Sequence, residues 1–517
     1  MRASGILLHP TSLPSPHGVG DLGDGALRFA GWLAAAGQRL WQVLPLGPAG
    51  YGDSPYQALS AFAGNPLLVS LEALWREGLL EAADLEPPPF PERAVDYGAV
   101  IPWKARRLRL AAGRFAARAA PAEREALAAF REREAGWLDD FALFLAVKER
   151  QGGRPWVEWP RDLAGRDPAA LLLARRALSA EIEAQVFAQF AFFRQWAALR
   201  ERCRERGLSL MGDLPIYLAH DSAEVWARRR LFRLDAAGRP EVVAGVPPDY
   251  FSASGQRWGN PLHDWEAQRA EGFAFWVERV RAALSLCDRV RLDHFRGFEA
   301  CWEIPASEPT AQRGRWVPGP GAALFQALRR ELGALPLVAE NLGVITPEVE
   351  ALRRGFGLPG MAILQFAFGD DPQAPTFRPH NWERDLVAYS GTHDNDTALG
   401  WWTGEGPGHS TRTPESVARE RERARRYLAT DGAEMNWTFI RTLGASVADT
   451  VVVPLQDPLG LGSEARLNVP GRALGNWRWR FAEGDCTPEL AARLREVAET
   501  YERVSPLPRP HESPRLA

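Results

Sequence analysis

Cysteine is scarce in this sequence, with four residues in a chain of 517. They are Cys203, Cys287, Cys301 and Cys486, and no two of them form a CxxC pair. A disulfide-stapled fold needs a dense cysteine framework, and a structural zinc site needs closely spaced ligands. The spacing therefore predicts neither of these, and it favours reduced cysteines in a cytoplasmic protein.

Long apolar runs are also missing. The chain begins MRASGILLHPTSLP, and the apolar stretch at 6–8 is too short for the core of a signal peptide. No uninterrupted apolar run approaches the roughly 18 residues that a membrane-spanning helix needs. The formal net charge is only -3, with both signs interspersed. We therefore expect neither nucleic acid nor a membrane as a partner.

What the chain does contain is a series of short apolar segments, each ending in a polar or glycine-rich turn. Because they lack clean alternation, they are typical of strands buried on both faces of a parallel sheet. These segments lie at 38–57, 208–219, 288–297, 335–343, 361–370, 385–396 and 449–460. Helix-like segments lie at 24–36, 178–206, 271–286, 320–333, 347–355 and 415–429. This alternating order predicts an α/β fold, a (β/α)8 TIM barrel.

Such a barrel needs about 250 residues, so about half of this chain must lie in insertions. We expect one catalytic barrel over 1–505, with large, mostly helical insertions between the barrel strands. The main helical insertion is expected at 66–190. A second insertion at 220–270, rich in Pro, Gly and aromatic residues, is expected to cover the site as a lid. The tail at 506–517 is expected to be disordered.

Four of the apolar segments end in a carboxylate at about the same place. Asp213 follows LSLMG, Asp293 follows RVRL, Glu340 follows LPLVA and Asp394 follows VAYSGTH. The carboxyl ends of parallel barrel strands converge on one mouth, so these acids are expected to meet there. Two close carboxylates suit retaining glycoside chemistry, in which one attacks the anomeric carbon and the other protonates the leaving oxygen.

The neighbours of two acids suggest different charge states. Arg291 and Arg296 flank Asp293, and strand alternation places Arg291 on the same face as Asp293. Because a guanidinium holds a nearby carboxylate ionised, Asp293 is interpreted as a nucleophile with a low pKa. Glu340 follows an apolar segment and has no obvious cation beside it, as expected for an acid that stays partly protonated.

Simpler interpretations exist for each of these features. A single Asp after a strand is more often a helix cap or a turn residue, so only the set of four favours a site. His294 and His393 adjoin acids, which leaves a metal site conceivable. However, the sequence has no HExxH motif and no His pair at helical spacing, so we expect no metal and no cofactor. Most of the 20 Trp are expected to be core residues, including those in NWRWR.

Taken together, these stretches resemble one family. RLDHFRG, AENLG and GTHDND, with GDLPIYLAHDSAEVW upstream, are similar to segments of the 4-α-glucanotransferases, called amylomaltases or disproportionating enzymes, in glycoside hydrolase family 77 of the α-amylase clan. HPTSLP near the N-terminus and GVPPDYFSASGQRWGNPLHDW at 245–265 carry the resemblance more specifically. It extends from about residue 5 to 505 and is weakest at 85–190.

The resemblance implies three catalytic residues. Asp293 would be the nucleophile that forms a covalent glycosyl-enzyme, and Glu340 would be the general acid and base. Asp394 would hold the hydroxyls of the distorted sugar. The resemblance also implies a set of sugar-binding residues: Tyr51, Tyr56, Asp213, Asp249, Trp258, Arg291, His294, His393 and Asn468.

Within that set, Asp213, Arg291, His294 and His393 would line the subsite where the bond breaks, and Tyr56 would stack on the sugar there. Trp258 would support the acceptor side, Asn468 would bind a donor glucose, and Asp249 lies in the loop at 245–252 that would form the lid.

Two departures from the family pattern stand out. Asn341 follows Glu340 where many relatives carry Asp. Ile101 lies where some relatives have an aromatic residue shortly after DYG, which leaves a remote glucan-holding site at Tyr51 open.

The resemblance implies a cytoplasmic 4-α-glucanotransferase that acts on α-1,4-glucans and maltooligosaccharides, with glucose as an acceptor. A monomer or weak homo-oligomer is expected. The alternatives are an α-1,4-glucan hydrolase on the same fold and a non-catalytic glucan-binding protein. The catalytic acids do not separate transfer from hydrolysis, because water and sugar attack the same intermediate.

Overall fold

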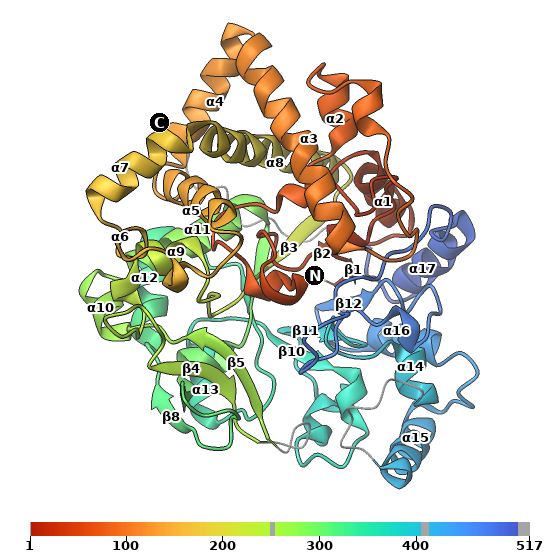
Figure 1. Cartoon of the computed structure of the whole chain (residues 1–517). Helices are drawn as coiled ribbons and strands as arrows, with labels where there is room; N and C mark the ends of the chain where they lie inside the picture. Colours follow the sequence, from red (N-terminus) through yellow and green to blue (C-terminus); the bar gives the residue numbers. More distant parts are fainter. Residues whose placement is uncertain (1, 249–253, 405–412, 505–517) are drawn as a thin grey trace.

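The computed structural model describes residues 2–248, 254–404 and 413–504 (Figure 1). Its centre is a sheet of eight strands, in the order β10-β11-β12-β1-β2-β3-β6-β9. Every pair of neighbouring strands in this sheet is parallel. The strands are β1 (Ala3–Leu7), β2 (Leu40–Gln42), β3 (Ser209–Leu214), β6 (Arg289–Leu292), β9 (Leu337–Ala339), β10 (Gly360–Ile363), β11 (Leu386–Tyr389) and β12 (Thr450–Pro454).

The two terminal strands of this sheet, β9 and β10, are joined at a seam that closes it into a barrel. The Ala339 N–H donates to the Pro359 carbonyl over 2.8 Å. The Met361 N–H donates to the Asn341 side-chain oxygen, also over 2.8 Å. The predicted (β/α)8 barrel is confirmed. The sequence pattern missed the first strand, β1, which precedes every predicted segment. A five-residue strand that contains Ser and Gly carries little apolar signal.

The barrel interior explains why the strands are apolar without alternation. Inward-facing residues form one buried cluster that includes Leu7, Met211, Val338 and Tyr389, while outward-facing residues pack against the helices. Gly5 is required by close packing, because a Cβ there would lie 2.5 Å from Leu40. The strands therefore read as continuous apolar runs.

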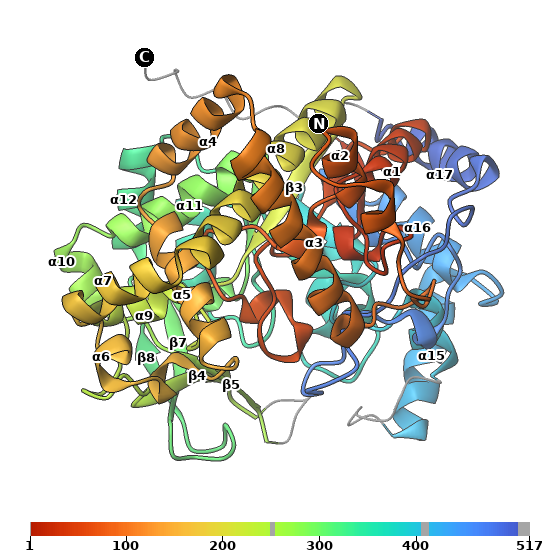
Figure 2. The same cartoon turned by 45° about the horizontal axis from the view of Figure 1, so that its top comes forward.

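Helices surround the barrel, as Figures 1 and 2 show. They are α1 (Asp24–Ala35), α8 (Ser179–Glu205), α11 (Ala274–Leu286), α12 (Ala322–Leu332), α13 (Pro347–Gly355), α14 (Ala398–Thr403), α15 (Pro414–Leu428), α16 (Met435–Ala445) and α17 (Pro488–Thr500). The sequence pattern did not mark the short helix α14, and it also missed α16 and α17. The latter nonetheless has a clear start signal, because Thr487 accepts the Leu490 N–H and Pro488 follows it.

The stretch at 66–190 is drawn in orange and yellow above the barrel in Figure 1. Its helices are α2 (Leu71–Arg76), α3 (Tyr97–Arg118), α4 (Pro121–Arg133), α5 (Leu138–Arg150), α6 (Arg161–Ala164) and α7 (Pro168–Ala177). The division of the chain into a barrel, a helical insertion and a lid stays a proposal.

The stretch at 220–270 is not mainly helical. It holds the short helices α9 (Ala223–Ala227) and α10 (Trp265–Ala270), and two strands of a separate antiparallel sheet. That sheet has the order β5-β4-β7-β8. Its strands are β4 (Val242–Val246), β5 (Gln256–Pro261), β7 (Ala300–Pro305) and β8 (Arg315–Pro318). The expected lid loop at 245–252 and the tail at 506–517 fall partly and wholly outside the described residues.

All four cysteines are free thiols, and three of them are buried. In the part of the chain that the structure describes, no helix has both the length and the hydropathy to cross a bilayer.

Candidate active site

The register of the barrel brings Asp293 and Glu340 together. Asp293 is the first residue after β6, and Glu340 is the first residue after β9, which pairs directly with β6. The Glu340 N–H donates to the Leu292 carbonyl over 3.1 Å, and the Phe295 N–H donates to the Glu340 carbonyl over 3.1 Å. The backbone of Glu340 is thus hydrogen-bonded to residues before and after Asp293.

Arg291 bridges two of the acids. It lies in β6, opposite Asp213 of β3, and its side chain is 5% exposed. One guanidinium nitrogen donates to Asp213, and the other donates to Asp293 over 2.8 Å. The Tyr56 hydroxyl also donates to Asp213, over 2.7 Å. Asp213, whose side chain is fully buried, is therefore paired and hydrogen-bonded, as a buried charge must be.

The two central acids differ in pKa. Burial raises the pKa of Glu340 to about 8, with Asp293 adding to the rise and Arg291 opposing it. Burial also raises the pKa of Asp293 to about 6, although Arg291 acts to lower it. The low pKa expected for Asp293 is therefore wrong, because desolvation outweighs the guanidinium. The order of the two groups still leaves Asp293 ionised and Glu340 protonated near pH 7.

His294 follows Asp293 directly and has a left-handed backbone, with φ of 51°. In this conformation its backbone N–H donates to the Glu340 carboxyl at Oε2 over 2.6 Å. Its imidazole meets Trp258 edge to face, with ring centroids 4.8 Å apart. Burial lowers the pKa of His294 to about 4, so the ring is neutral at pH 7.

Asp394 is presented by the loop between β11 and α14. Its carboxylate accepts a 2.6 Å hydrogen bond from the Asn468 amide, and His393 Nε2 lies 3.3 Å away. Desolvation alone would raise the pKa of Asp394, but His393 and Asn468 outweigh it and hold the pKa well below its ordinary value. With 45% of its side chain exposed, this carboxylate is both ionised and accessible.

Aromatic rings form one wall of the site. The Tyr56 ring stacks on His393 at a centroid distance of 5.0 Å and an angle of 17°. Trp477 packs against both of them, at 5.8 Å from each. The sequence analysis treated NWRWR as core sequence; Trp477 is indeed buried, yet it packs on rings of the site. No local pattern distinguishes it from an ordinary core Trp.

Arg466 is a second residue that the sequence analysis did not single out. It donates to the Asp394 carbonyl over 2.6 Å and to the Asn468 carbonyl over 2.7 Å. It thereby ties the loop of Asp394 to the segment that carries Asn468. The signal for it was its place two residues before Asn468 in ARLNVPG.

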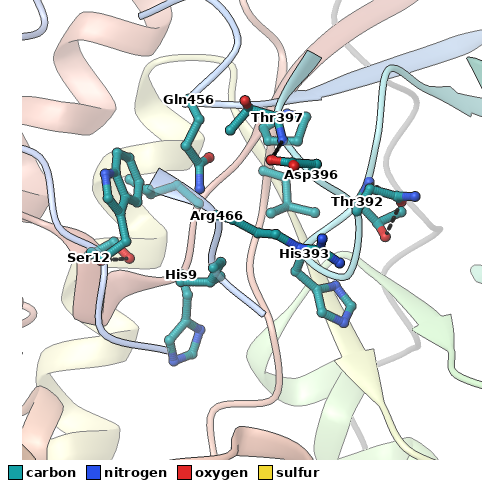
Figure 3. Close-up of a pocket in the computed structure, with 14 residues that line it drawn as sticks. His9, Ser12, Thr392, His393, Asp396, Thr397, Gln456 and Arg466 are labelled. Carbon is teal, nitrogen blue, oxygen red and sulfur yellow. Dashed lines mark hydrogen bonds between the residues drawn. The ribbon is translucent and has the colours of Figure 1, made fainter. Parts of the chain in front are cut away.

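His393 lines a small pocket, and Figure 3 shows the side chains around it. The N-terminal segment after β1, the loop at 392–397 and the segment after β12 all contribute. The labelled lining residues are His9, Ser12, Thr392, His393, Asp396, Thr397, Gln456 and Arg466. Burial lowers the pKa of His9 to about 3, and His393 adds to the effect. His9 is therefore neutral at pH 7.

Tyr51 is not part of this cluster. Tyr51 lies in a short 3-10 turn (Tyr51–Asp53) and is 75% exposed. Asp249 lies outside the described residues. Within the described ranges, no group of three or more His, Cys, Asp or Glu is placed to hold a metal ion.

The geometry suits one kind of chemistry. Two ionised carboxylates, Asp293 and Asp394, and one protonated carboxyl, Glu340, share the mouth of the barrel, which aromatic rings border. This set is what retaining glycoside cleavage needs: a nucleophile, an acid and a group that holds sugar hydroxyls. Aromatic faces suit the apolar faces of sugar rings.

Comparison with known proteins agrees with this assignment. The family model described as 4-alpha-glucanotransferase, glycoside hydrolase family 77, matches residues 8–486. The chain is 54% identical to the 4-alpha-glucanotransferase of Thermus thermophilus over 97% of this chain and 99% of that protein. It is 47% identical to the enzyme of the same name from Synechocystis, over 97% and 98%.

Solved structures show the same likeness. The amylomaltase from Streptococcus agalactiae, solved in complex with acarbose, superposes with a TM-score of 0.92 at 37% identity. The match covers 97% of this chain and 100% of that one. The amylomaltase from Corynebacterium glutamicum shares the fold, with a TM-score of 0.76 at 21% identity over 97% of this chain and 74% of that one.

Proposed function

This chain belongs to the 4-α-glucanotransferase family, glycoside hydrolase family 77, and from that premise we propose which of its residues carry each step of the reaction. The chain is an enzyme that transfers a segment of an α-1,4-glucan to the hydroxyl of an acceptor sugar. The resemblance found in its sequence is confirmed, and neither a plain hydrolase nor a glucan-binding protein is favoured.

In the first step, Asp293 attacks the anomeric carbon while Glu340 protonates the leaving oxygen. The reducing-end part of the glucan leaves, and the rest stays bonded to Asp293. The Arg291 guanidinium, 2.8 Å from Asp293, keeps this carboxylate oriented for attack. Glu340 accepts the His294 N–H at Oε2, so its proton resides on Oε1, which is the oxygen left to serve the leaving group.

In the second step, the ionised Glu340 takes a proton from the 4-hydroxyl of an acceptor, and that oxygen displaces Asp293. Each displacement inverts the anomeric carbon, so the product keeps the α configuration. Asp394 holds hydroxyls of the distorted sugar through both steps, and Asp213, His294 and His393 line the same subsite. Trp258 supports the acceptor side, and Asn468 binds a donor glucose while it orients Asp394.

The remaining assignments follow from the same reading. We propose that glucose and maltooligosaccharides are acceptors, that Tyr56 stacks on the sugar at the cleaved bond, and that Asp249 contributes from the lid. Tyr51, exposed at the surface, is proposed to hold a glucan outside the cleft. A cytoplasmic location is supported by the four free thiols. We propose a monomer or weak homo-oligomer.

The observation that carries the role assignment is the pairing of an Arg-bound Asp293 with a half-buried Glu340 at the mouth of the barrel. Incubation with maltotriose tests it, because transfer produces glucose and a ladder of longer oligomers without a net gain in reducing ends. Asp293→Asn should abolish turnover while maltooligosaccharide binding, followed by Trp fluorescence, persists. Asp449→Asn, which changes an acid beside β12 at the opposite end of the barrel, is the matched control. Full activity in the Asp293 variant would contradict the assignment.

A further inference from the structure

Asp457 is a buried carboxylate that the roles above do not use. It lies just after β12 and is 1% exposed. Burial raises the pKa of Asp457 to about 6, and the charged group that acts on it, Asp396, raises it further. A carboxylate in such a place is stable only if hydrogen bonds satisfy it. The partners of Asp457 therefore indicate what it does.

Both oxygens of Asp457 bind the loop that presents His393 and Asp394. Oδ2 accepts the Ser390 hydroxyl over 2.5 Å, and Oδ1 accepts the Ala398 backbone N–H over 2.7 Å. Ser390 is the first residue after β11, and Ala398 is the first residue of α14. One side chain thus holds the two ends of the same loop.

Asp457 is itself fixed to rigid elements. Its N–H donates to the Pro454 carbonyl at the end of β12 over 3.0 Å. Its carbonyl accepts the Asn436 amide of α16 over 2.8 Å. The carboxylate therefore holds the loop at a fixed place relative to β12 and α16.

The middle of the loop has separate bonds that fix its shape. The Thr392 N–H and hydroxyl both donate to the Asn395 side chain over 2.9 Å. These local bonds do not determine where the loop lies relative to Asp293 and Glu340. Bonds to residues outside the loop do: Arg466 and Gln365 donate to the Asp394 and Asp396 carbonyls, the Ser463 hydroxyl donates to the Asp396 carboxylate, and the Asn468 N–H donates to the His393 carbonyl. Asp457 differs from these in holding both ends of the loop with one side chain.

We propose that Asp457 is a positioning residue for catalysis, whose carboxylate clamps both ends of the loop at 390–398 and so sets where His393 and Asp394 meet the reacting sugar. It does not touch the substrate. Because Asp394 is proposed to act on the distorted sugar, a shift of the loop lowers kcat more than it weakens substrate binding. A misplacement of about 1 Å in such a group costs about 10²-fold in rate.

The substitutions Asp457→Ala and Asp457→Asn separate this role from mere burial of an acid. The Ala variant loses both bonds. In the Asn variant, the amide oxygen still accepts the Ala398 N–H and the amide nitrogen donates to the Ser390 hydroxyl, which also accepts. We expect Asp457→Ala to lose about 10²-fold in kcat with KM changed less than about threefold. Asp457→Asn should recover most of that loss.

Ser390→Ala removes one of the two bonds and keeps the carboxylate. We expect it to lower kcat to a value between those of wild type and Asp457→Ala. When Ser390→Ala is combined with Asp457→Ala, it should lower kcat by less than it does alone, because both changes remove the same hydrogen bond. Asp288→Ala is the matched control, since Asp288 accepts the Leu210 N–H over 2.8 Å at the amino end of β3. This variant should lose stability and keep wild-type kcat.

All kcat values are measured on maltotriose at the same interval below each variant's Tm. The inference rests on the proposed roles, so the wild-type assay comes first: absence of transfer there contradicts the proposed function rather than the clamp. If wild type transfers and Asp457→Ala keeps wild-type kcat, the clamp is overturned. If Asp457→Ala does not fold, wild-type kcat in Ser390→Ala overturns it, and a kcat reduced at unchanged KM supports it.

Discussion

The backbone N–H of His294 donates to Oε2 of Glu340 over 2.6 Å, so the residue after the proposed nucleophile holds the proposed acid. This bond exists because His294 adopts a left-handed conformation, with φ of 51°, in which His, Asn and Asp are the commonest residues after Gly and which β-branched residues rarely adopt. In this conformation the backbone turns its N–H toward Glu340, at the end of β9, rather than continuing β6. The two catalytic carboxyls are therefore coupled through one peptide group.

The value of this conformation is testable by comparing His294→Asn with His294→Val. Both changes remove the imidazole, but Asn tolerates the left-handed region and a β-branched residue does not. We expect the Val variant to be less stable than the Asn variant by about 1–2 kcal/mol and to have a several-fold lower kcat. Urea unfolding and kcat on maltotriose measure the two effects. Equal stability and kcat in the two variants would show that the backbone conformation is unimportant.

The pKa order of the two acids predicts a bell-shaped pH profile of kcat/KM. Asp293 must be ionised, so activity should fall as the pH drops through about 6. Glu340 must be protonated for the first step, so activity should fall as the pH rises through about 8. Profiles measured with maltotriose check both limbs.

A glucosyl fluoride donor supplies the control for this profile, because fluoride leaves without a proton. With it, the alkaline limb of kcat/KM should disappear and the acidic limb should stay. An alkaline limb that persists with the fluoride would assign it to a group other than Glu340.

Sequence patterns located the acids but not their environment. Asp293 and Glu340 were predictable because each ends a short apolar strand, and a parallel barrel gathers such ends. The pKa of Asp293 was not, since the flanking Arg291 is visible in the sequence while the burial that outweighs it is a property of the folded site. The role of Asp457 was not predictable either, because its partners Ser390 and Ala398 precede it by 67 and 59 residues and meet it only in the folded chain.

Asn341 closes the barrel seam beside Glu340. Its oxygen accepts the Met361 N–H over 2.8 Å, and its nitrogen donates to Glu350 over 2.7 Å. In Asn341→Asp, the donor becomes a carboxylate that faces Glu350. We expect about 1–3 kcal/mol lower stability at pH 7, with less loss at a pH low enough to protonate either acid. Urea unfolding at pH 4 and pH 7 measures the difference.

The substitution Glu350→Gln in the Asn341→Asp background is the corresponding rescue, because the Gln amide then donates to the new carboxylate. Most of the lost stability should return in the double variant, and kcat should stay close to wild type throughout. No recovery in the double variant would mean that the Asn341–Glu350 bond does not stabilise the seam.

Arg291 holds two acids at once through two separate nitrogens, a geometry that a lysine does not reproduce. A guanidinium presents separate nitrogens to Asp213 and Asp293, whereas an ammonium acts as a single point charge. Arg291 lowers the pKa of Asp293 against the effect of burial. Weakening that contact in Arg291→Lys should therefore raise this pKa, move the acidic limb of kcat/KM to higher pH and lower kcat at pH 7 by about 10²-fold. Arg289→Lys, a change at the start of the same strand, should leave the profile unchanged. An acidic limb that stays in place in Arg291→Lys would show that Arg291 does not control the ionisation of Asp293.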